Sequence, residues 1–143
     1  QDSLGESKAT LSPELDALAA YMYSLIETPT SPYTLSNTEH DTALDAFNNQ
    51  GCNDCHGGAL WTDSSLSMLQ RHDVGTLTES SGYRLGDHLD GLDTPTLLGL
   101  WSSGPYLHDG SAETIEDAIR AHTGYENLDE ETSILLVSLL QSL

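Results

Sequence analysis

The chain has 143 residues, 37% of them apolar, which is enough for one domain with a core. Its 23 acidic residues outnumber four Lys and Arg, and the formal net charge is -19. Such a surface repels nucleic acid and anionic membranes, so we expect neither as a partner. No apolar run approaches the roughly 20 residues that span a bilayer, so we also expect no membrane insertion.

The N-terminal part predicts a linker followed by a helix. Residues 1–10 are polar and typical of a disordered linker or a processed end. Residues 11–27 predict a helix, because Ser12 can cap it and Pro13 suits its first turn. We expect residues 11–143 to form a single domain, as a mature protein or as a module of a larger one.

The middle of the chain predicts one more helix and then a long irregular stretch. A helix is expected from Thr38, where Thr38 and Asp41 approximate a capping box. Residues 57–110 are rich in Gly, Ser, Thr, Asp and Pro and show no sustained period, apart from a short helix expected at 94–100. A long irregular stretch in a small domain indicates that it is functional or wraps around something.

Two helices are expected at the C-terminal end. Thr114 and Asp117 resemble a capping box, and a shared apolar face follows, made of Ile115, Ala118, Ile119 and His122. The final helix is expected at about 129–143. Its sequence, LDEETSILLVSLLQSL, echoes LSPELDALAAYMYSL near the N-terminus down to the closing Ser-Leu, although two amphipathic helices can also be alike by chance. Four to five short helices with long loops predict an all-α fold.

The segment GCNDCH holds both cysteines of the chain, Cys52 and Cys55, followed directly by His56. It fits the C-x-x-C-H pattern of covalent haem attachment, in which two thiols bond to the haem and the next imidazole binds the iron. Three alternatives stay open. A zinc site needs more ligands than this segment offers, a redox pair normally follows a strand, and a structural disulfide leaves His56 without a role.

The second axial ligand decides between electron transfer and chemistry at an open iron. His122 is the favoured candidate, because it lies on an apolar helix face, although a histidine there can also be an ordinary core residue. Met68 is the next candidate. His108 is expected to hydrogen-bond a haem propionate or cap its loop, and Trp101 and Tyr106 to pack against haem or within the core.

Four motifs in order resemble the second haem domain of the bacterial di-haem cytochrome c peroxidases and their relatives. The motifs lie in GCNDCHGGALWTD, HDVGT and DTPTLLGLWSSGPYLHDGSAETIEDAIRAH, and the resemblance covers about residues 47–143. It implies a cytochrome-c-like fold around one haem c, thioether bonds at Cys52 and Cys55, and His56 as the proximal ligand. It also implies that His122 stands where the family's electron-transfer haem commonly takes Met, which predicts bis-histidine ligation. The helix at 11–27 would then be a relic of a preceding domain.

The resemblance predicts a function in electron transfer. The family's peroxidases use two haems, whereas one C-x-x-C-H implies one, so the chain is expected to be a carrier and not an enzyme. The alternative is a peroxidase-like enzyme or small-ligand sensor with an open or displaceable distal site, helped by His72–Asp73 or His108–Asp109.

The redox partner is expected to be a basic protein, another cytochrome or an extracellular oxidoreductase such as a copper oxygenase. Covalent haem attachment and export go together in bacteria, which predicts a periplasmic or extracellular protein, either a monomer or a module of a larger one.

Overall fold

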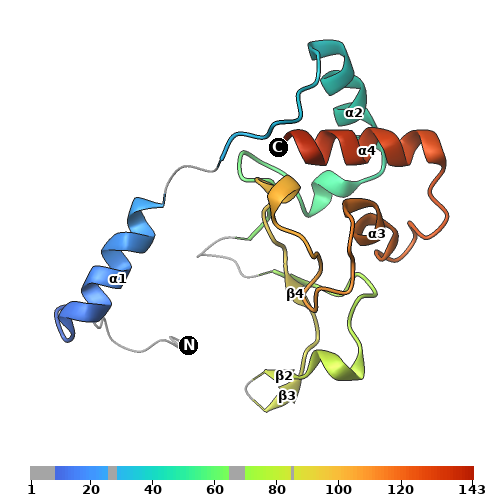
Figure 1. Cartoon of the computed structure of the whole chain (residues 1–143). Helices are drawn as coiled ribbons and strands as arrows, with labels where there is room; N and C mark the ends of the chain where they lie inside the picture. Colours follow the sequence, from blue (N-terminus) through green and yellow to red (C-terminus); the bar gives the residue numbers. More distant parts are fainter. Residues whose placement is uncertain (1–8, 26–28, 65–69, 85) are drawn as a thin grey trace.

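A computed structural model describes residues 9–25, 29–64, 70–84 and 86–143. Within them the chain forms four α-helices, joined by long loops that hold three short 3₁₀ turns (Figure 1). The helices are α1 (Pro13–Ser24), α2 (Asn37–Asn49), α3 (Ile115–Arg120) and α4 (Glu130–Ser142). The 3₁₀ turns are Cys52–Asp54, Glu79–Ser81 and Leu100–Ser102.

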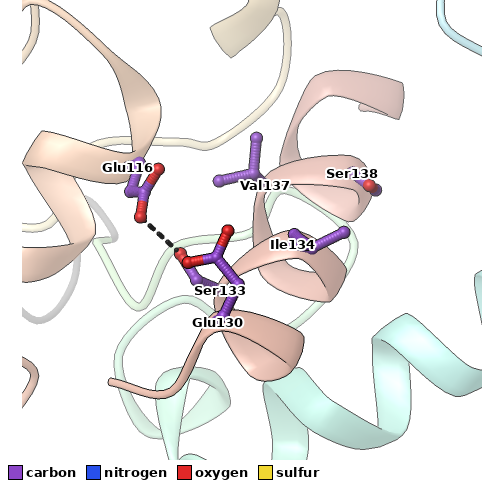
Figure 2. A pocket seen from close by; sticks show the side chains of 6 residues that line it. All are labelled: Glu116, Glu130, Ser133, Ile134, Val137 and Ser138. Carbon is purple, nitrogen blue, oxygen red and sulfur yellow. Dashed lines mark hydrogen bonds between the residues drawn. The ribbon is translucent and has the colours of Figure 1, made fainter. Parts of the chain in front are cut away.

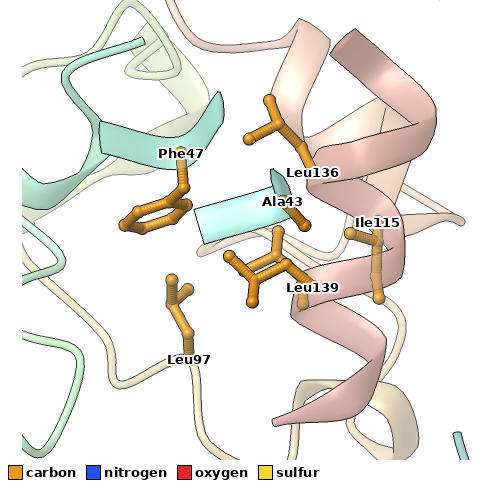
Figure 3. Packing of buried hydrophobic residues seen from close by; sticks show 7 residues of the cluster. Ala43, Phe47, Leu97, Ile115, Leu136 and Leu139 are labelled. Atoms are coloured by element: carbon orange, nitrogen blue, oxygen red, sulfur yellow. The ribbon is translucent and has the colours of Figure 1, made fainter. Parts of the chain in front are cut away.

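The core lies where α2 packs against α4 (Figure 3). Ala43 and Phe47 are one helical turn apart on α2, and they meet Leu136 and Leu139 of α4, which are almost completely buried. The remaining buried members of the cluster are Leu97, Ile115 and Leu140. Because α2 runs directly into the turn that holds Cys52, this helix pair positions the cysteine segment.

Side-chain caps begin each of these helices. Ser12 caps α1 and Thr114 caps α3 with Asp117 in a capping box, as predicted. The predicted cap of α2 at Thr38 is two residues too late, because Ser36 and Glu39 form the capping box and helical residues begin at Asn37. Glu39 reaches back to the Ser36 N–H, which the shorter Asp41 was expected to do for Thr38.

The expectation of an all-α fold needs correction, because the irregular stretch contains two small antiparallel sheets. Strand β1 (Arg71–His72) pairs with β4 (Leu92–Asp93), and β2 (Tyr83–Arg84) pairs with β3 (Asp87–His88). Two-residue strands are too short to show an alternating pattern in the sequence. The helix expected at 94–100 is also absent, and a 3₁₀ turn begins at Leu100 instead. The fold is therefore helix-rich with loops and a small sheet component.

Helix α1 differs from the other helices because none of its residues is buried. Figure 1 shows it apart from the α2–α4 pair. In contrast, the segment that follows it returns to the core, where the Ser31 hydroxyl donates a hydrogen bond to the Gln141 carbonyl near the end of α4. None of the helices among the described residues has the length and apolar character needed to cross a membrane.

Candidate functional site

The cysteine segment forms one tight turn at the end of α2. Gly51 begins it with a φ of 76°, a left-handed conformation that glycine adopts without strain. The His56 N–H then donates to the Cys52 carbonyl over 2.9 Å and closes the turn. Two thiols and one imidazole are therefore carried on five consecutive residues with a defined backbone.

Both cysteines are thiols that are not joined to each other. Burial raises the pKa of Cys52 above its ordinary value, and it also raises that of Cys55. The negative charge of Asp63 raises the pKa of Cys55 further. The half-buried side chains thus stay protonated at neutral pH, and the disulfide alternative has no support in the described residues.

The imidazole of His56 is oriented through its Nδ1 atom. Nδ1 lies 3.4 Å from the Trp61 carbonyl, a long contact. A carbonyl only accepts hydrogen bonds, so Nδ1 carries the proton and Nε2 keeps a lone pair for a metal. Trp61 is itself held by an edge-to-face contact with Phe47, with ring centroids 5.2 Å apart.

The imidazole of His122 is held in the same way. Its Nδ1 donates to the Ala118 carbonyl over 2.8 Å, which again leaves Nε2 as the atom with the lone pair. The neighbouring Thr123 N–H donates to the Val74 carbonyl over 2.8 Å and anchors the end of α3 to the irregular stretch. His122 is half-buried.

The electrostatic surroundings of His56 include His122. Burial lowers the pKa of His56, and positive charge on His122 lowers it further. Carbonyls of Trp61 and Pro95 partly offset both effects. His122, which follows α3, therefore lies within electrostatic range of His56, which follows α2.

The other predicted site residues have separate places. The Tyr106 hydroxyl donates to the Leu100 carbonyl over 3.0 Å, and its ring packs against the hydrophobic core. His108 is exposed and its Nε2 lies 2.8 Å from the Ser81 hydroxyl. Trp101 is half-buried, and its Nε1 is buried with no hydrogen-bond partner among the described residues. Met68 lies outside the described residues.

An Asp63–His72 pair was missed by sequence reasoning, which paired His72 with Asp73. His72 Nε2 lies 2.7 Å from Asp63 Oδ2, whereas Asp73 accepts a hydrogen bond from the Gly75 N–H. The ligand atoms of Cys55, Asp63 and His72 all lie within 4.8 Å of one another. His72 belongs to β1, whose position is set by pairing with β4. Pairing between such distant segments leaves no local signal in the sequence.

The surface of the described residues is hollowed beside the cysteine segment and again between α3 and α4. One cavity, of about 350 Å³, lies beside the cysteine segment and is lined by residues that include Phe47, Asn53, His56 and Trp61. The other, of about 140 Å³, lies between α3 and α4, where the Ser133 hydroxyl donates to Glu116 (Figure 2). The cavity beside the cysteine segment adjoins the candidate site, whereas none of the predicted site residues lines the one between α3 and α4.

The described residues fit a covalently attached haem by their donor chemistry. Cys52 and Cys55 offer two protonated thiols from one turn, and His56 and His122 offer two imidazole lone pairs. The buried Trp101 N–H is a donor without an acceptor, which a haem carboxylate would satisfy. The site therefore has the features of a haem-attachment domain of helical, cytochrome-like construction.

The comparisons with known proteins agree with this class of fold. The sequence is 30% identical to hydrazine synthase subunit gamma of Kuenenia stuttgartiensis over 65% of this chain. The structure matches hydrazine synthase of the same organism with a TM-score of 0.68 and 28% identity over 92% of this chain. It also matches a MauG-like protein associated with microbial copper homeostasis, with a TM-score of 0.67 and 18% identity over 95% of this chain.

This chain is shorter than each of these proteins. It spans 35% of the curated relative's length, 56% of the matched hydrazine synthase chain and 58% of the MauG-like chain. No protein-family model matches it.

The expectation that the chain is not an enzyme is wrong. It rested on the single C-x-x-C-H of this chain, but both sequence and structure are similar to hydrazine synthase, which is an enzyme. Counting haem motifs in one segment cannot exclude catalysis when the similar proteins extend well beyond the matched region.

Proposed function

We propose that the chain is a c-type haem domain that passes single electrons as part of a redox enzyme. The observation that carries this proposal is the single turn that presents Cys52, Cys55 and His56, with His122 within electrostatic range of His56. A bound haem supplies an iron that cycles between Fe(III) and Fe(II). The contribution of the chain is to tether it, to offer two imidazoles and to exclude water from the site.

One turn would supply the tether and the first ligand, and the segment after α3 would supply the second ligand. Cys52 and Cys55 would form the thioether bonds, since burial keeps them as thiols until they react. His56 and His122 would bind the iron through Nε2, because each Nδ1 is committed to a backbone carbonyl. These carbonyls hold the rings in place, so the ligands need little rearrangement when an electron arrives.

The charge of the chain supports a basic redox partner. A net charge of -19 attracts a positively charged protein patch, and salt weakens this attraction over roughly 10 Å at 0.1 M. An exported redox protein, another cytochrome or an oxidoreductase such as a copper oxygenase could present such a patch. Covalent haem attachment further supports a location outside the cytoplasm, in the periplasm or beyond.

A second candidate function is catalysis at the iron itself. The likeness to hydrazine synthase favours it. In this case His122 would leave the iron and open a position for a small molecule. His122 is half-buried and outside the buried core, and it forms local hydrogen bonds with Ala118, Ile119 and Tyr125. Whether His122 can leave the iron therefore separates the two functions.

One set of spectra tests both candidates. The chain is expressed with haem-attachment machinery, and intact mass reports covalent haem. Low-spin spectra in both oxidation states that do not change with cyanide or carbon monoxide support electron transfer. Ready ligand binding supports catalysis at the iron, and a colourless protein overturns both candidates.

Variants assign the ligand. His122→Ala is expected to turn the spectrum high-spin, while His88→Ala, a change at an exposed histidine of β3, leaves it low-spin. A low-spin His122→Ala protein would show that another residue is the distal ligand.

A further inference from the structure

Three side chains of different chemistry meet beside the cysteine turn. Cys55 offers a sulfur, Asp63 a carboxylate oxygen and His72 an imidazole nitrogen, and these atoms all lie within 4.8 Å of one another. His72 Nε2 and Asp63 Oδ2 are 2.7 Å apart. All three residues are half-buried, so they are held in place and can still be reached from solvent. Together they form a ligand set for one metal ion.

The second oxygen of Asp63 gives independent evidence for a cation. Oδ1 is buried, yet it has no hydrogen-bond partner among the described residues. Leaving a buried polar oxygen unsatisfied costs free energy, and most such atoms in folded proteins are satisfied by a donor, a water or an ion. The Asp63 carboxylate therefore has capacity left for a cation in addition to its contact with His72.

The chain holds this ligand set in one frame. His72 belongs to β1, which pairs with β4. The Thr62 hydroxyl donates to the Thr94 carbonyl, just after β4, over 2.6 Å. The Thr62 N–H donates to the Gly57 carbonyl over 3.0 Å. Thr62 thus fastens the neighbouring Asp63 both to the end of β4 and to the cysteine turn, so that binding an ion requires little further ordering of the chain.

The donor atoms select the class of ion. Magnesium and calcium take oxygen ligands, whereas thiolate, imidazole and carboxylate together are typical of zinc. Tetrahedral zinc with bonds of about 2.0–2.3 Å keeps its ligand atoms roughly 3.5 Å apart, so small side-chain movements close this set around the ion. Two negative ligands and a neutral imidazole also balance the charge of Zn²⁺, which suits a half-buried site.

We propose that the haem-free chain binds one zinc ion through Cys55 Sγ, an Asp63 carboxylate oxygen and His72 Nε2, with water as the fourth ligand. When the ion binds, the Cys55 S–H bond breaks, its proton passes to solvent and a sulfur–zinc bond forms. His72 binds as a neutral imidazole with its hydrogen on Nδ1, so the ion replaces the hydrogen that Nε2 shares with Asp63.

The sulfur of Cys55 connects this site with the proposed function. Cys55 cannot be a zinc thiolate and a haem thioether at the same time, so zinc and covalent haem exclude each other there. Zinc therefore belongs to the chain before haem attachment, where it blocks the thioether bond at Cys55 and keeps this thiol from pairing with Cys52. The zinc site itself does not rest on the proposed function, whereas this exclusion does.

The first experiment measures metal binding by the intact chain, expressed without haem-attachment machinery and kept reduced. Cobalt is the coloured probe, zinc then competes with it, and native mass spectrometry counts the bound ions. We expect one ion per chain and a cobalt spectrum with a thiolate charge-transfer band and intense tetrahedral bands, both lost when zinc is added. A chain that binds no ion, or binds cobalt without the thiolate band, would overturn the proposal.

Variants of the three ligands assign the site. Cys55→Ser, Asp63→Asn and His72→Ala should each weaken zinc binding at least about tenfold. Asp73→Asn is the matched control for Asp63, because Asp73 accepts a hydrogen bond from the Gly75 N–H and is not in the ligand set. Zinc binding that survives both Asp63→Asn and His72→Ala would contradict the assignment.

A further pair of variants excludes binding by an unfolded chain. Without the fold, zinc would be held by the near neighbours Cys52, Cys55 and His56. In the folded chain Cys52→Ser and His56→Ala should retain zinc binding, because neither residue is in the ligand set. Losses in these two variants as large as the loss in Cys55→Ser would overturn the proposal.

Haem attachment separates this inference from the proposed function. The metal-free chain is incubated with reduced haem, with and without one equivalent of zinc, and intact mass measures covalent haem. Zinc should slow attachment to the unmodified chain but not to His72→Ala, and equal rates with and without zinc would overturn the exclusion. Zinc binding without any haem attachment counts against the proposed function alone, and haem attachment without zinc binding counts against the zinc site alone.

Discussion

His56 and His122 lie close enough for positive charge on His122 to lower the pKa of His56. Each ring is oriented by a backbone carbonyl of its own segment, from Trp61 for His56 and from Ala118 for His122. The relationship between the rings therefore depends on how the cysteine turn and α3 are held relative to each other. Changes that loosen either segment should affect both stability and the environment of the imidazoles.

The capping box of α3 should influence the site. Thr114 accepts a hydrogen bond from the Asp117 N–H over 3.1 Å, and α3 has only six residues. Thr114→Ala should cost roughly 1 kcal/mol in the free energy of unfolding. It should also raise the high-spin fraction of haem-loaded protein, because His122 follows α3 directly. Urea denaturation and absorption spectra measure the two effects. Thr38→Ala, in the first turn of α2 but with its side chain outside the Ser36–Glu39 capping box, should change neither.

Gly75 should be intolerant of a side chain. Its φ is +83°, and a Cβ there would come within 2.0 Å of the Thr123 hydroxyl. Gly75→Ala is expected to break the Val74–Thr123 contact, to lower the denaturation midpoint and to displace His122. Gly86→Ala, at φ +93° with no atom near the added carbon, is the control that separates crowding from backbone strain. Equal losses in the two variants would assign the effect to strain alone.

A buried leucine of α4 and an exposed leucine of α1 should respond differently to truncation. Leu139 is fully buried, so Leu139→Ala should cost about 2–5 kcal/mol in the free energy of unfolding. Leu18 of α1 is 55% exposed, so Leu18→Ala should change stability by less than about 0.5 kcal/mol. Urea titrations of the two variants provide the comparison. A large loss in Leu18→Ala would mean that α1 already packs on this chain.

Asp63 should contribute to acid stability. A hydrogen bond from Thr94 lowers its pKa below the ordinary 3.8, and a hydrogen bond and charge from His72 lower it further. Because the folded-state pKa is depressed, this contribution is complete above about pH 3.8 and is lost as pH falls through the lowered value. Asp63→Asn should therefore be less stable at pH 6 and lose less stability on acidification. Thermal melts from pH 6 to pH 2 measure this, and parallel curves for the two proteins would contradict it.

Local features were predictable because their determinants lie within a few residues. The Cys52–His56 segment was found from motif spacing, and its turn is closed by a hydrogen bond within the same five residues. Caps at Ser12 and Thr114 were found for the same reason, since a cap involves residues two or three positions apart. The start of α2 was misplaced because two capping boxes overlap there and only one forms.

Contacts between distant segments were not predictable in the same way. His72 pairs with Asp63 and not with its neighbour Asp73, because the pairing of β1 with β4 sets its position. The exposure of α1 was not predictable either. Its apolar residues recur as they do in a packed helix, and only the fold shows that none of them is buried.

The sequence by itself determined the chemistry available to this protein. It placed two thiols and an imidazole on one turn, and it put a second histidine at the end of a capped helix. Only the tertiary structure decided that His122 lies near His56, that α4 fills the face of α2 and that α1 has no partner among the described residues. The physical reason is that hydrogen bonds within a turn depend on neighbours in the chain, whereas packing depends on which distant surfaces meet and on the entropy lost when loops close.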